Sequence, residues 1–101
     1  MDPERLLDFD ISDVVVSTTG KDSGKLFYVI GTDKVFLMLA NGRERTLENP
    51  KKKKEKHVKK VLRSETRVAE KLRRGDKVLN SELRRDLAEF SQKMQSNNLG
   101  G

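Results

Sequence analysis

The densest chemical feature of the chain is a run of basic side chains between positions 51 and 60. Seven of these ten residues are lysines, namely Lys51, Lys52, Lys53, Lys54, Lys56, Lys59 and Lys60. Ammonium groups on long, flexible stems neutralise phosphates without requiring a particular base. A solvated charge run is the alternative, but the mutual repulsion of seven lysines would be relieved by a polyanion. We therefore expect this segment to bind a polyanion such as nucleic acid through its phosphates.

The charge of the chain is concentrated in its middle. The formal net charge of the 101 residues is +6, but residues 1–49 carry −3, residues 50–74 carry +9 and residues 75–101 are neutral. A local field of this strength raises the encounter rate with a phosphate backbone. Nucleic acid is therefore the expected partner.

Two further pairs of cations precede the lysine run. Lys21 and Lys25 flank a glycine-containing loop, from which their side chains either reach phosphates or remain solvated. Arg43 and Arg45 alternate within a predicted strand, so we expect them to share one face. Their guanidinium groups suit bidentate phosphate binding or base stacking, whereas weak exposed ion pairs with nearby carboxylates are the alternative.

His57 is the only histidine, and the chain has no cysteine. A single histidine lacks the companion ligands of a metal site and the nucleophile of a catalytic pair. We expect it to pack or to hydrogen-bond, with stacking on an RNA base as the alternative. The segment GKDSGK also lacks the spacing of a phosphate-binding P-loop. The sequence therefore predicts no enzymatic activity, no metal and no cofactor.

The elements that must position these residues begin with short strands. Branched and aromatic residues between polar turns predict strands over 14–16, 26–30, 35–39 and 43–48, with a fifth near 58–62. Asn41 and Gly42 are typical of a two-residue hairpin turn, which here would lead into the fourth strand. Short strands with tight turns do not make a stable flat sheet at this size, so we expect them to curl into a small β-barrel.

The same patterns predict which residues in this region are exposed. Like charges within residues 51–54 disfavour a regular packed element, so we expect the lysine run to form an exposed loop after Pro50. Alternation along a strand places only one of Phe27 and Tyr28 on the outside. We expect Tyr28 to be the exposed one.

Helical periodicity replaces the strand pattern after position 63. Ser64 is suited to cap a first helix and Gly75 to end it, which predicts a helix over 65–74. Asn80 or Ser81 is suited to cap a second helix. The apolar stripe of this second helix consists of Leu83, Leu87, Phe90 and Met94. Packing on the barrel is the default for such a stripe, and docking of a protein partner is the alternative.

Together these elements predict one mainly β domain with C-terminal helices, because 101 residues with 34% apolar content do not support a second core. Its parts are an N-terminal arm (1–11), a barrel (12–63) with a basic loop (50–60), a helical extension (64–95) and a disordered tail (96–101). No apolar run approaches the roughly 20 residues that span a bilayer, and the N-terminus is acidic where a secretory signal is basic. We expect a cytoplasmic protein that is monomeric when free.

A resemblance to a known family is carried by the stretch DVVVSTTGKDSGK, residues 13–25. The KOW motif of ribosomal and transcription-elongation proteins resembles this region at Val14, Val15, Gly20, Lys21, Asp22, Gly24, Lys25 and Val29. The segment NGR at 41–43, followed by NPKKKKEKH at 49–57, is similar to bacterial small KOW-domain RNA-binding proteins. Those proteins in turn resemble large-subunit ribosomal proteins of archaea and eukaryotes. The resemblance covers residues 12–60 and departs from the family at Ser23, where a basic residue is common.

The resemblance implies an SH3-like barrel that binds RNA, with ribosomal RNA of the large subunit as the expected partner and a contact with a ribosomal protein as a further one. It also implies that Gly20, Asp22 and Gly24 form the turn of the motif. The alternative is an SH3-like adaptor that binds a ribosomal or transcription-elongation protein. In that case the apolar stripe of the second helix would matter most.

Overall fold

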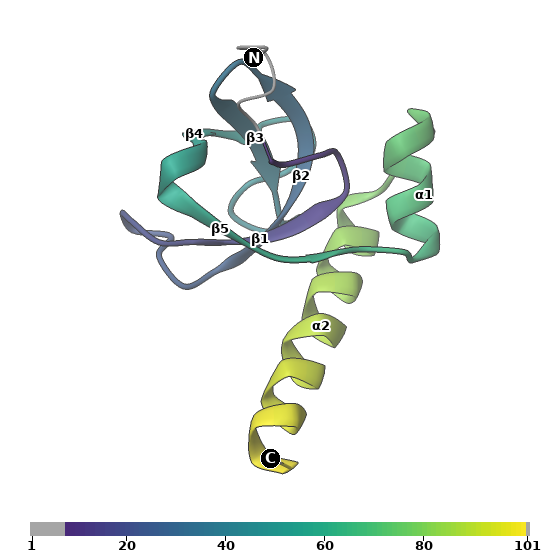
Figure 1. Ribbon diagram of the computed structural model, residues 1–101. Coiled ribbons are helices and arrows are strands. Elements are labelled where there is room, and N and C mark those ends of the chain that lie inside the picture. The colour runs from purple at the N-terminus through teal and green to yellow at the C-terminus, as the bar shows by residue number, and fades with distance from the viewer. Residues whose placement is uncertain (1–7, 101) are drawn as a thin grey trace.

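The computed structural model describes residues 8–100, with side chains up to residue 95, and shows a five-stranded antiparallel sheet followed by two helices (Figure 1). The strands are β1 (Asp13–Ser17), β2 (Leu26–Asp33), β3 (Phe36–Ala40), β4 (Lys51–Lys54) and β5 (Val58–Arg63). A short 3-10 turn, η2 (Glu55–His57), joins β4 to β5. The helices are α1 (Arg67–Arg74) and α2 (Asn80–Gly100). The mainly β class with C-terminal helices is confirmed, while most of the predicted N-terminal arm lies outside the described residues.

The sheet is curved and has two open edges. Its strand order is β4-β3-β2-β1-β5, so the last strand returns to pair with the first. The pairing register shifts between Val14 and Val15 and between Val29 and Gly31, and irregularities of this kind bend a sheet. β4 and β5 are the edge strands, and no ladder joins them within residues 8–100. The expected closure into a barrel is therefore not observed, because η2 carries the chain from one edge to the other without pairing them.

The segment predicted as a fourth strand, 43–48, is a loop instead. The side-chain oxygen of Asn41 accepts hydrogen bonds from the backbone N–H groups of Arg43 and Arg45, and the carbonyl of Arg45 accepts from Asn41 and Gly42. These local bonds satisfy backbone groups that a hairpin ladder would otherwise use. The predicted two-residue hairpin is therefore wrong, and Arg43 and Arg45 do not share a strand face.

The lysine run forms the fourth strand, β4, so the prediction of an exposed loop at 51–54 is also wrong. β4 pairs with β3 in the register Phe36 to Lys54 through Leu39 to Lys51. Repulsion between the lysines is limited because alternate side chains of a strand point to opposite faces. Lys53 is buried, whereas Lys52 and Lys54 are exposed. The basic segment 50–60 thus contains an edge strand, a turn and the start of β5.

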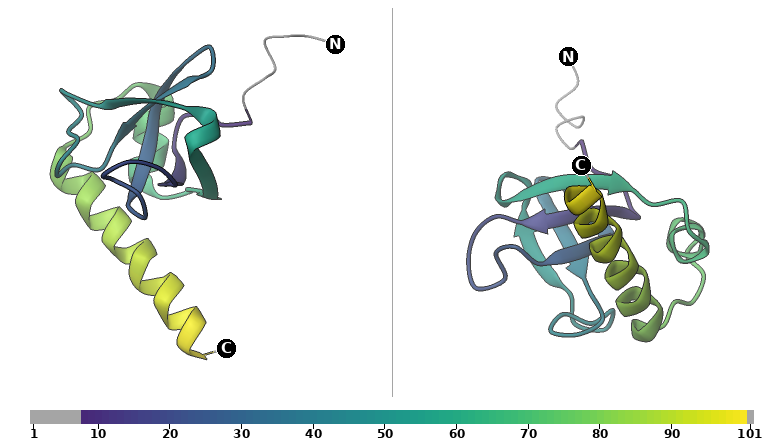
Figure 2. Two further views of the ribbon diagram at one scale, coloured as in Figure 1. Left: turned by 90° about the vertical axis from the view of Figure 1, so that its left-hand side faces the viewer. Right: turned by 90° about the horizontal axis from the view of Figure 1, so that it is seen from below.

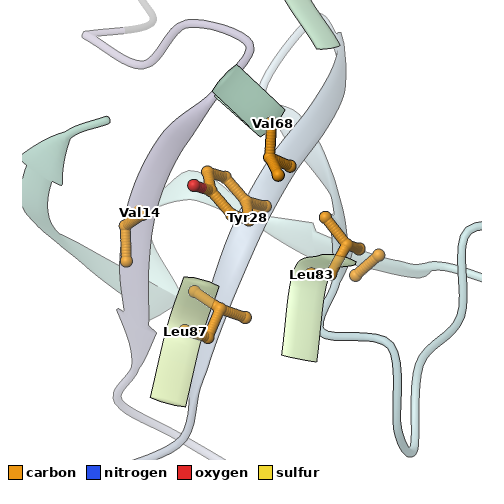
Figure 3. Close-up of a cluster of buried hydrophobic side chains, with 6 residues drawn as sticks. Val14, Tyr28, Val68, Leu83 and Leu87 are labelled. Carbon is orange, nitrogen blue, oxygen red and sulfur yellow. The ribbon is translucent and has the colours of Figure 1, made fainter. Parts of the chain in front are cut away.

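Both faces of the central strands are buried. On one face the core residues come from the sheet and from both helices, namely Val14, Tyr28, Ala40, Val68, Leu83 and Leu87, as Figure 3 shows. On the opposite face they come from the sheet alone, namely Val15, Phe27, Val29, Leu37, Leu39 and Val58. Tyr28 is fully buried, like its neighbour Phe27, because α1 and α2 cover the face that we expected to be exposed. The predicted exposure of Tyr28 is therefore wrong.

A buried hydrogen-bond cluster fixes the helices to the sheet. The Tyr28 hydroxyl donates to the Asp86 carboxylate at 2.7 Å and lies 2.8 Å from the Ser64 hydroxyl. Thr66 donates to the same carboxylate at 2.6 Å. Burial raises the pKa of Tyr28, and the hydrogen bond to Asp86 and its charge raise it further. β2, the chain before α1, and α2 are thereby joined through one set of polar side chains.

The first helix starts slightly later than expected. Thr66, rather than Ser64, is its N-cap and accepts a hydrogen bond from the backbone N–H of Ala69. Ser64 is used in the buried cluster instead. Gly75 ends the helix in the left-handed conformation, as predicted.

The start of the second helix is stabilised differently from the prediction. Glu82 lies in the first turn of α2, and its carboxylate accepts a hydrogen bond from the backbone N–H of Leu79 at 2.9 Å. The Asn80 side chain, which we expected to cap the helix, instead accepts from the backbone N–H of Leu47 and donates to Glu48. α2 continues to Gly100, through the segment predicted to be a disordered tail, and extends well beyond the sheet (Figure 2).

Candidate nucleic-acid interface

Lys53 is the one lysine of β4 that is turned into the molecule. Its side chain is 8% exposed, and its ammonium group donates 2.7 Å hydrogen bonds to Asp22, to the Ser17 hydroxyl and to the carbonyl of Thr19. All three donors of the ammonium are therefore satisfied within the chain. Lys53 was predicted to bind RNA, and the structure instead assigns it to holding the loop between β1 and β2.

The carboxylate of Asp22 is the other half of this arrangement. It accepts from Lys53 and from Ser17, at 2.7 and 2.8 Å. Burial raises the pKa of Asp22, but the hydrogen bonds from Lys53 and Ser17 outweigh that effect, so its pKa lies below the ordinary value. The predicted motif turn at Gly20, Asp22 and Gly24 is thus a compact loop anchored to β4. Both of its glycines have positive φ, +82° and +89°.

Three other predicted RNA contacts are engaged in ion pairs. Lys25 lies 3.5 Å from Glu44, Lys52 lies 3.6 Å from Asp33, and Lys60 lies 3.2 Å from Asp13. The first two pairs are exposed on both sides, and such pairs are weak enough to exchange for a phosphate. The third differs because Asp13 is almost fully buried. Lys60 is therefore held more firmly than Lys25 and Lys52.

Seven of the lysines and arginines predicted to contact RNA have no carboxylate within ion-pairing distance in the described part of the chain. They are Lys21, Arg43, Arg45, Lys51, Lys54, Lys56 and Lys59, and we refer to them as the cationic rim. Most of these side chains are exposed, and Arg45 and Lys51 are half-buried. Positive charge that is not neutralised within the molecule remains available to a polyanion.

The fold brings three members of the cationic rim together from two loops and β4. Lys21, Arg45 and Lys51 line one hollow of about 240 Å³, which lies between the β1–β2 loop, the β3–β4 loop and β4. The backbone N–H of Thr18 donates to the carbonyl of His57 at 2.9 Å, which places the β1–β2 loop next to η2. The remaining lysines of the rim lie on β4, on η2 and on β5, that is, on the two edge strands and the turn that joins them.

A larger hollow adjoins the first one. It has a volume of about 390 Å³, and its cations are Lys25, Arg43 and Arg84. Lys25 and Glu44 line both hollows. Arg84, on α2, was missed by the sequence reasoning, which considered cations only on the first helix and an apolar stripe on the second. The available signal was that Arg84, Leu87, Ala88 and Ser91 are spaced i, i+3, i+4 and i+7, which puts all four on one helix face.

Aromatic side chains play a smaller part at this surface than in the core. Phe27 and Tyr28 are fully buried, so neither is available for stacking. Phe36 is half-buried, and the ammonium group of Lys52 lies 4.7 Å from the centre of its ring, with that of Lys54 at 6.0 Å. His57 is half-buried beside the β1–β2 loop.

Comparison of the chain with protein-family models and with curated proteins finds no match in either. The resemblance to KOW proteins therefore stays a prediction. No helix within residues 8–100 has the length and apolar character needed to cross a membrane. The side chains described here also contain no cluster of three or more histidines or carboxylates able to hold a metal ion.

Proposed function

We propose that this protein is a non-catalytic, cytoplasmic RNA-binding module of the KOW type that docks on structured RNA, with ribosomal RNA of the large subunit as its target. The observation that carries the proposal is the cationic rim, in which seven positive side chains have no ion-pair partner among the described residues and three of them, from different segments, line one hollow. Binding is by contact with phosphates, which fix orientation without reading sequence.

Some lysines form ion pairs within the chain and others do not, and this difference supports a surface that binds a partner rather than one that only confers solubility. Acidic residues of β1, β2 and the adjoining loops form ion pairs with Lys25, Lys52, Lys53 and Lys60, and none is within ion-pairing distance of the rim among the described residues. Concentrated charge of one sign repels itself and is relieved by a polyanion. The rim therefore favours RNA over an acidic protein patch, which rarely offers negative charge at comparable density.

The SH3-like part of the proposal concerns the sheet. Five consecutive antiparallel strands, of which the last returns to the first, together with the two register shifts, support a curved SH3-like arrangement with open edges. The glycine loop at positions 20–24 lies between the first two of these strands.

The adaptor alternative depended on an exposed apolar stripe along α2. Leu83 is fully buried and Leu87 nearly so, and Phe90 is half-buried against the same cluster. Met94 alone of the four is exposed, at 38%. The packing leaves this alternative without the surface on which it was based.

The proposal is tested by the salt dependence of RNA binding. We expect the triple variant Lys54→Gln, Lys56→Gln, Lys59→Gln to bind several unrelated structured RNAs more weakly by a similar factor. The slope of log Kd against log salt concentration should fall by about 0.7 to 0.9 for each phosphate that the variant no longer neutralises. The measurement is fluorescence anisotropy over a series of salt concentrations.

The matched control is the triple variant Arg67→Gln, Lys77→Gln, Lys93→Gln, which removes the same charge from positions outside the rim. Its salt slope should stay close to that of the wild type. Equal slopes for the two triple variants would show that only net charge matters and would contradict the proposed interface. Sedimentation of the tagged protein in cell lysate then tests the ribosomal target, since a salt-sensitive peak with the large subunit is expected.

A further inference from the structure

The larger hollow combines an apolar floor with a cationic border. Leu26 and Leu87 line it together with Ala88, which belongs to the exposed side of α2. Its volume of about 390 Å³ falls in the range of pockets that bind small organic groups. The floor is made by the start of β2 and by the second and third turns of α2, so it is rigid.

The cations of this hollow come from three different segments. Arg43 is exposed and belongs to the cationic rim, while Lys25 is held only by its exposed pair with Glu44. Arg84 donates from one guanidinium nitrogen to the carbonyl of Gly42 at 2.7 Å, which fixes its position. Since a guanidinium group carries five N–H donors, Arg84 keeps donors for a ligand.

The neutral polar groups that Asn41 and Gly42 present to the hollow are largely occupied. The side-chain oxygen of Asn41 accepts from the backbone of Arg43 and Arg45, and its amide donates to Glu44. The carbonyl of Gly42 is taken by Arg84. The hydroxyl of Ser91 also lines the hollow, but because a hydroxyl can donate or accept, it does not select a particular base. The hollow therefore offers an apolar surface and anion-binding groups without a means to read base identity.

We propose that this hollow receives one unpaired nucleotide of a bound RNA, with the base on the floor of Leu26, Leu87 and Ala88 and its phosphates at Arg43 and Arg84. This inference rests on the proposed RNA-binding function. A nucleotide combines the flat, weakly polar face of its base with an adjacent phosphate. The floor and the border of the hollow match these two parts. The smaller hollow next to it, bordered by Lys21 and Lys51, continues the phosphate path. The protein thereby prefers RNA with a bulged or looped nucleotide over a continuous duplex, whatever the identity of that nucleotide.

The test compares two RNA hairpins that differ only by a single bulged uridine. By fluorescence anisotropy at one salt concentration, we expect the wild type to bind the bulged hairpin about fivefold more tightly, the effect of burying roughly 40 Å² of apolar base surface. Ala88→Phe fills the hollow from an exposed helix position and should abolish this preference, so that the variant binds both hairpins equally well. Gln92→Phe adds the same ring at an exposed position of α2 that lines neither hollow, and it should retain the preference.

The outcomes separate this inference from the function on which it rests. Equal, salt-sensitive binding of both hairpins by the wild type would overturn the nucleotide hollow and leave the RNA-binding function standing. Binding of neither hairpin would overturn the function itself. Retention of the preference by a correctly folded Ala88→Phe, checked by its circular dichroism and thermal unfolding, would place the bulge elsewhere on the protein and would also overturn the hollow.

Discussion

At the scale of single residues, two adjacent lysines of β4 have opposite roles. Lys53 is buried and donates to Asp22, Ser17 and Thr19, whereas Lys54 is exposed and has no carboxylate partner among the described residues. Removing one member of a buried ion pair leaves the other charge unsatisfied, while removing an exposed lysine costs little stability.

Lys53→Met should therefore lower the free energy of unfolding by about 2 to 3 kcal/mol, because it leaves Asp22 partly buried without its partner. Lys54→Met should change stability by less than about 0.5 kcal/mol and instead weaken RNA binding and flatten its salt dependence. Urea denaturation and anisotropy measure the two properties. Similar stability losses in both variants would contradict the assigned roles.

The same pair predicts a pH dependence of stability. The pKa of Asp22 is lowered in the folded state, so its contribution is present above the ordinary aspartate value of about 3.9 and is lost as the pH falls through the lower folded pKa. The difference in free energy of unfolding between the wild type and Asp22→Asn should therefore shrink on acidification. Denaturation at a series of acidic pH values measures it, and a difference that is independent of pH would show that the charge of Asp22 contributes nothing.

At this scale the sequence identified the kinds of residue at the candidate interface but not their individual roles. The composition of the basic segment predicted a cationic surface, and the flanking of the glycine loop by Lys21 and Lys25 was visible. Four consecutive lysines, however, are chemically identical, so the sequence holds no signal for which one faces inward. That choice depends on Asp22, which is 31 positions away and comes close only in the folded sheet.

At the scale of elements, the long β3–β4 connection is held by the start of α2. Asn80 accepts from the backbone of Leu47, and Arg84 donates to the carbonyl of Gly42. Gly42 has a φ of +79°, and a Cβ atom there would collide with the carbonyl oxygen of Asn80. The loop that carries Arg43 and Arg45 is therefore positioned by a helix that begins more than 30 residues later.

Gly42→Ala should destabilise the protein by about 3 kcal/mol, from the collision and from the left-handed backbone together. Gly24→Ala is the matched control, since Gly24 has a φ of +89° but an added Cβ meets nothing within 4 Å. Its cost should be the conformational one alone, about 1 kcal/mol. Thermal unfolding ranks the two variants, and equal costs would show that contact with α2 does not constrain the loop.

The sequence predicted most elements correctly where the pattern was local. The strands near 14–16, 26–30, 35–39 and 58–62 and both helices are present, because branched residues, glycine stops and apolar spacing act over a few residues. The fourth strand was placed at 43–48 because the Asn41–Gly42 pair normally forms a hairpin turn. Here the Asn41 side chain closes a local loop, and the strand forms from lysines with poor strand propensity because an edge of the sheet is available to pair with.

At the scale of the whole molecule, the helices complete the core. Val14, Tyr28 and Ala40 are fully buried beneath residues of α1 and α2, so the sheet exposes an apolar face without them. The barrel (12–63) and the helical extension (64–95), which were predicted as separate parts, therefore share one buried cluster.

A chain that ends at residue 63 should fail to fold, because it loses half of the buried cluster that covers one face of the sheet and the partners of the Tyr28 hydroxyl. Its proton–nitrogen NMR spectrum should be poorly dispersed, without a cooperative thermal transition. A chain that ends at residue 95 should unfold at nearly the same temperature as the full chain. A well-dispersed spectrum from the shorter chain would instead establish the sheet as an independent domain.

The mainly β class of the fold could be predicted from the sequence. The two open edges of the sheet and the burial of both of its faces could not. Periodicity reports which residues are apolar, and it does not report whether an apolar face meets another strand or a helix. Tyr28 illustrates the difference, since the same alternation fits exposure or coverage by α2. Arg84 was missed for the same reason, because its neighbours in space are set by how α2 crosses the sheet.

The position of the rim outside the core determines how amino-acid substitutions in it should act. None of its seven cations belongs to either buried cluster, and none is tied to a carboxylate in the described chain. If the proposed function is correct, substitutions there should raise or lower affinity for RNA in small steps without a matching change in thermal stability. Lys53 is the position in β4 where a substitution should instead change stability.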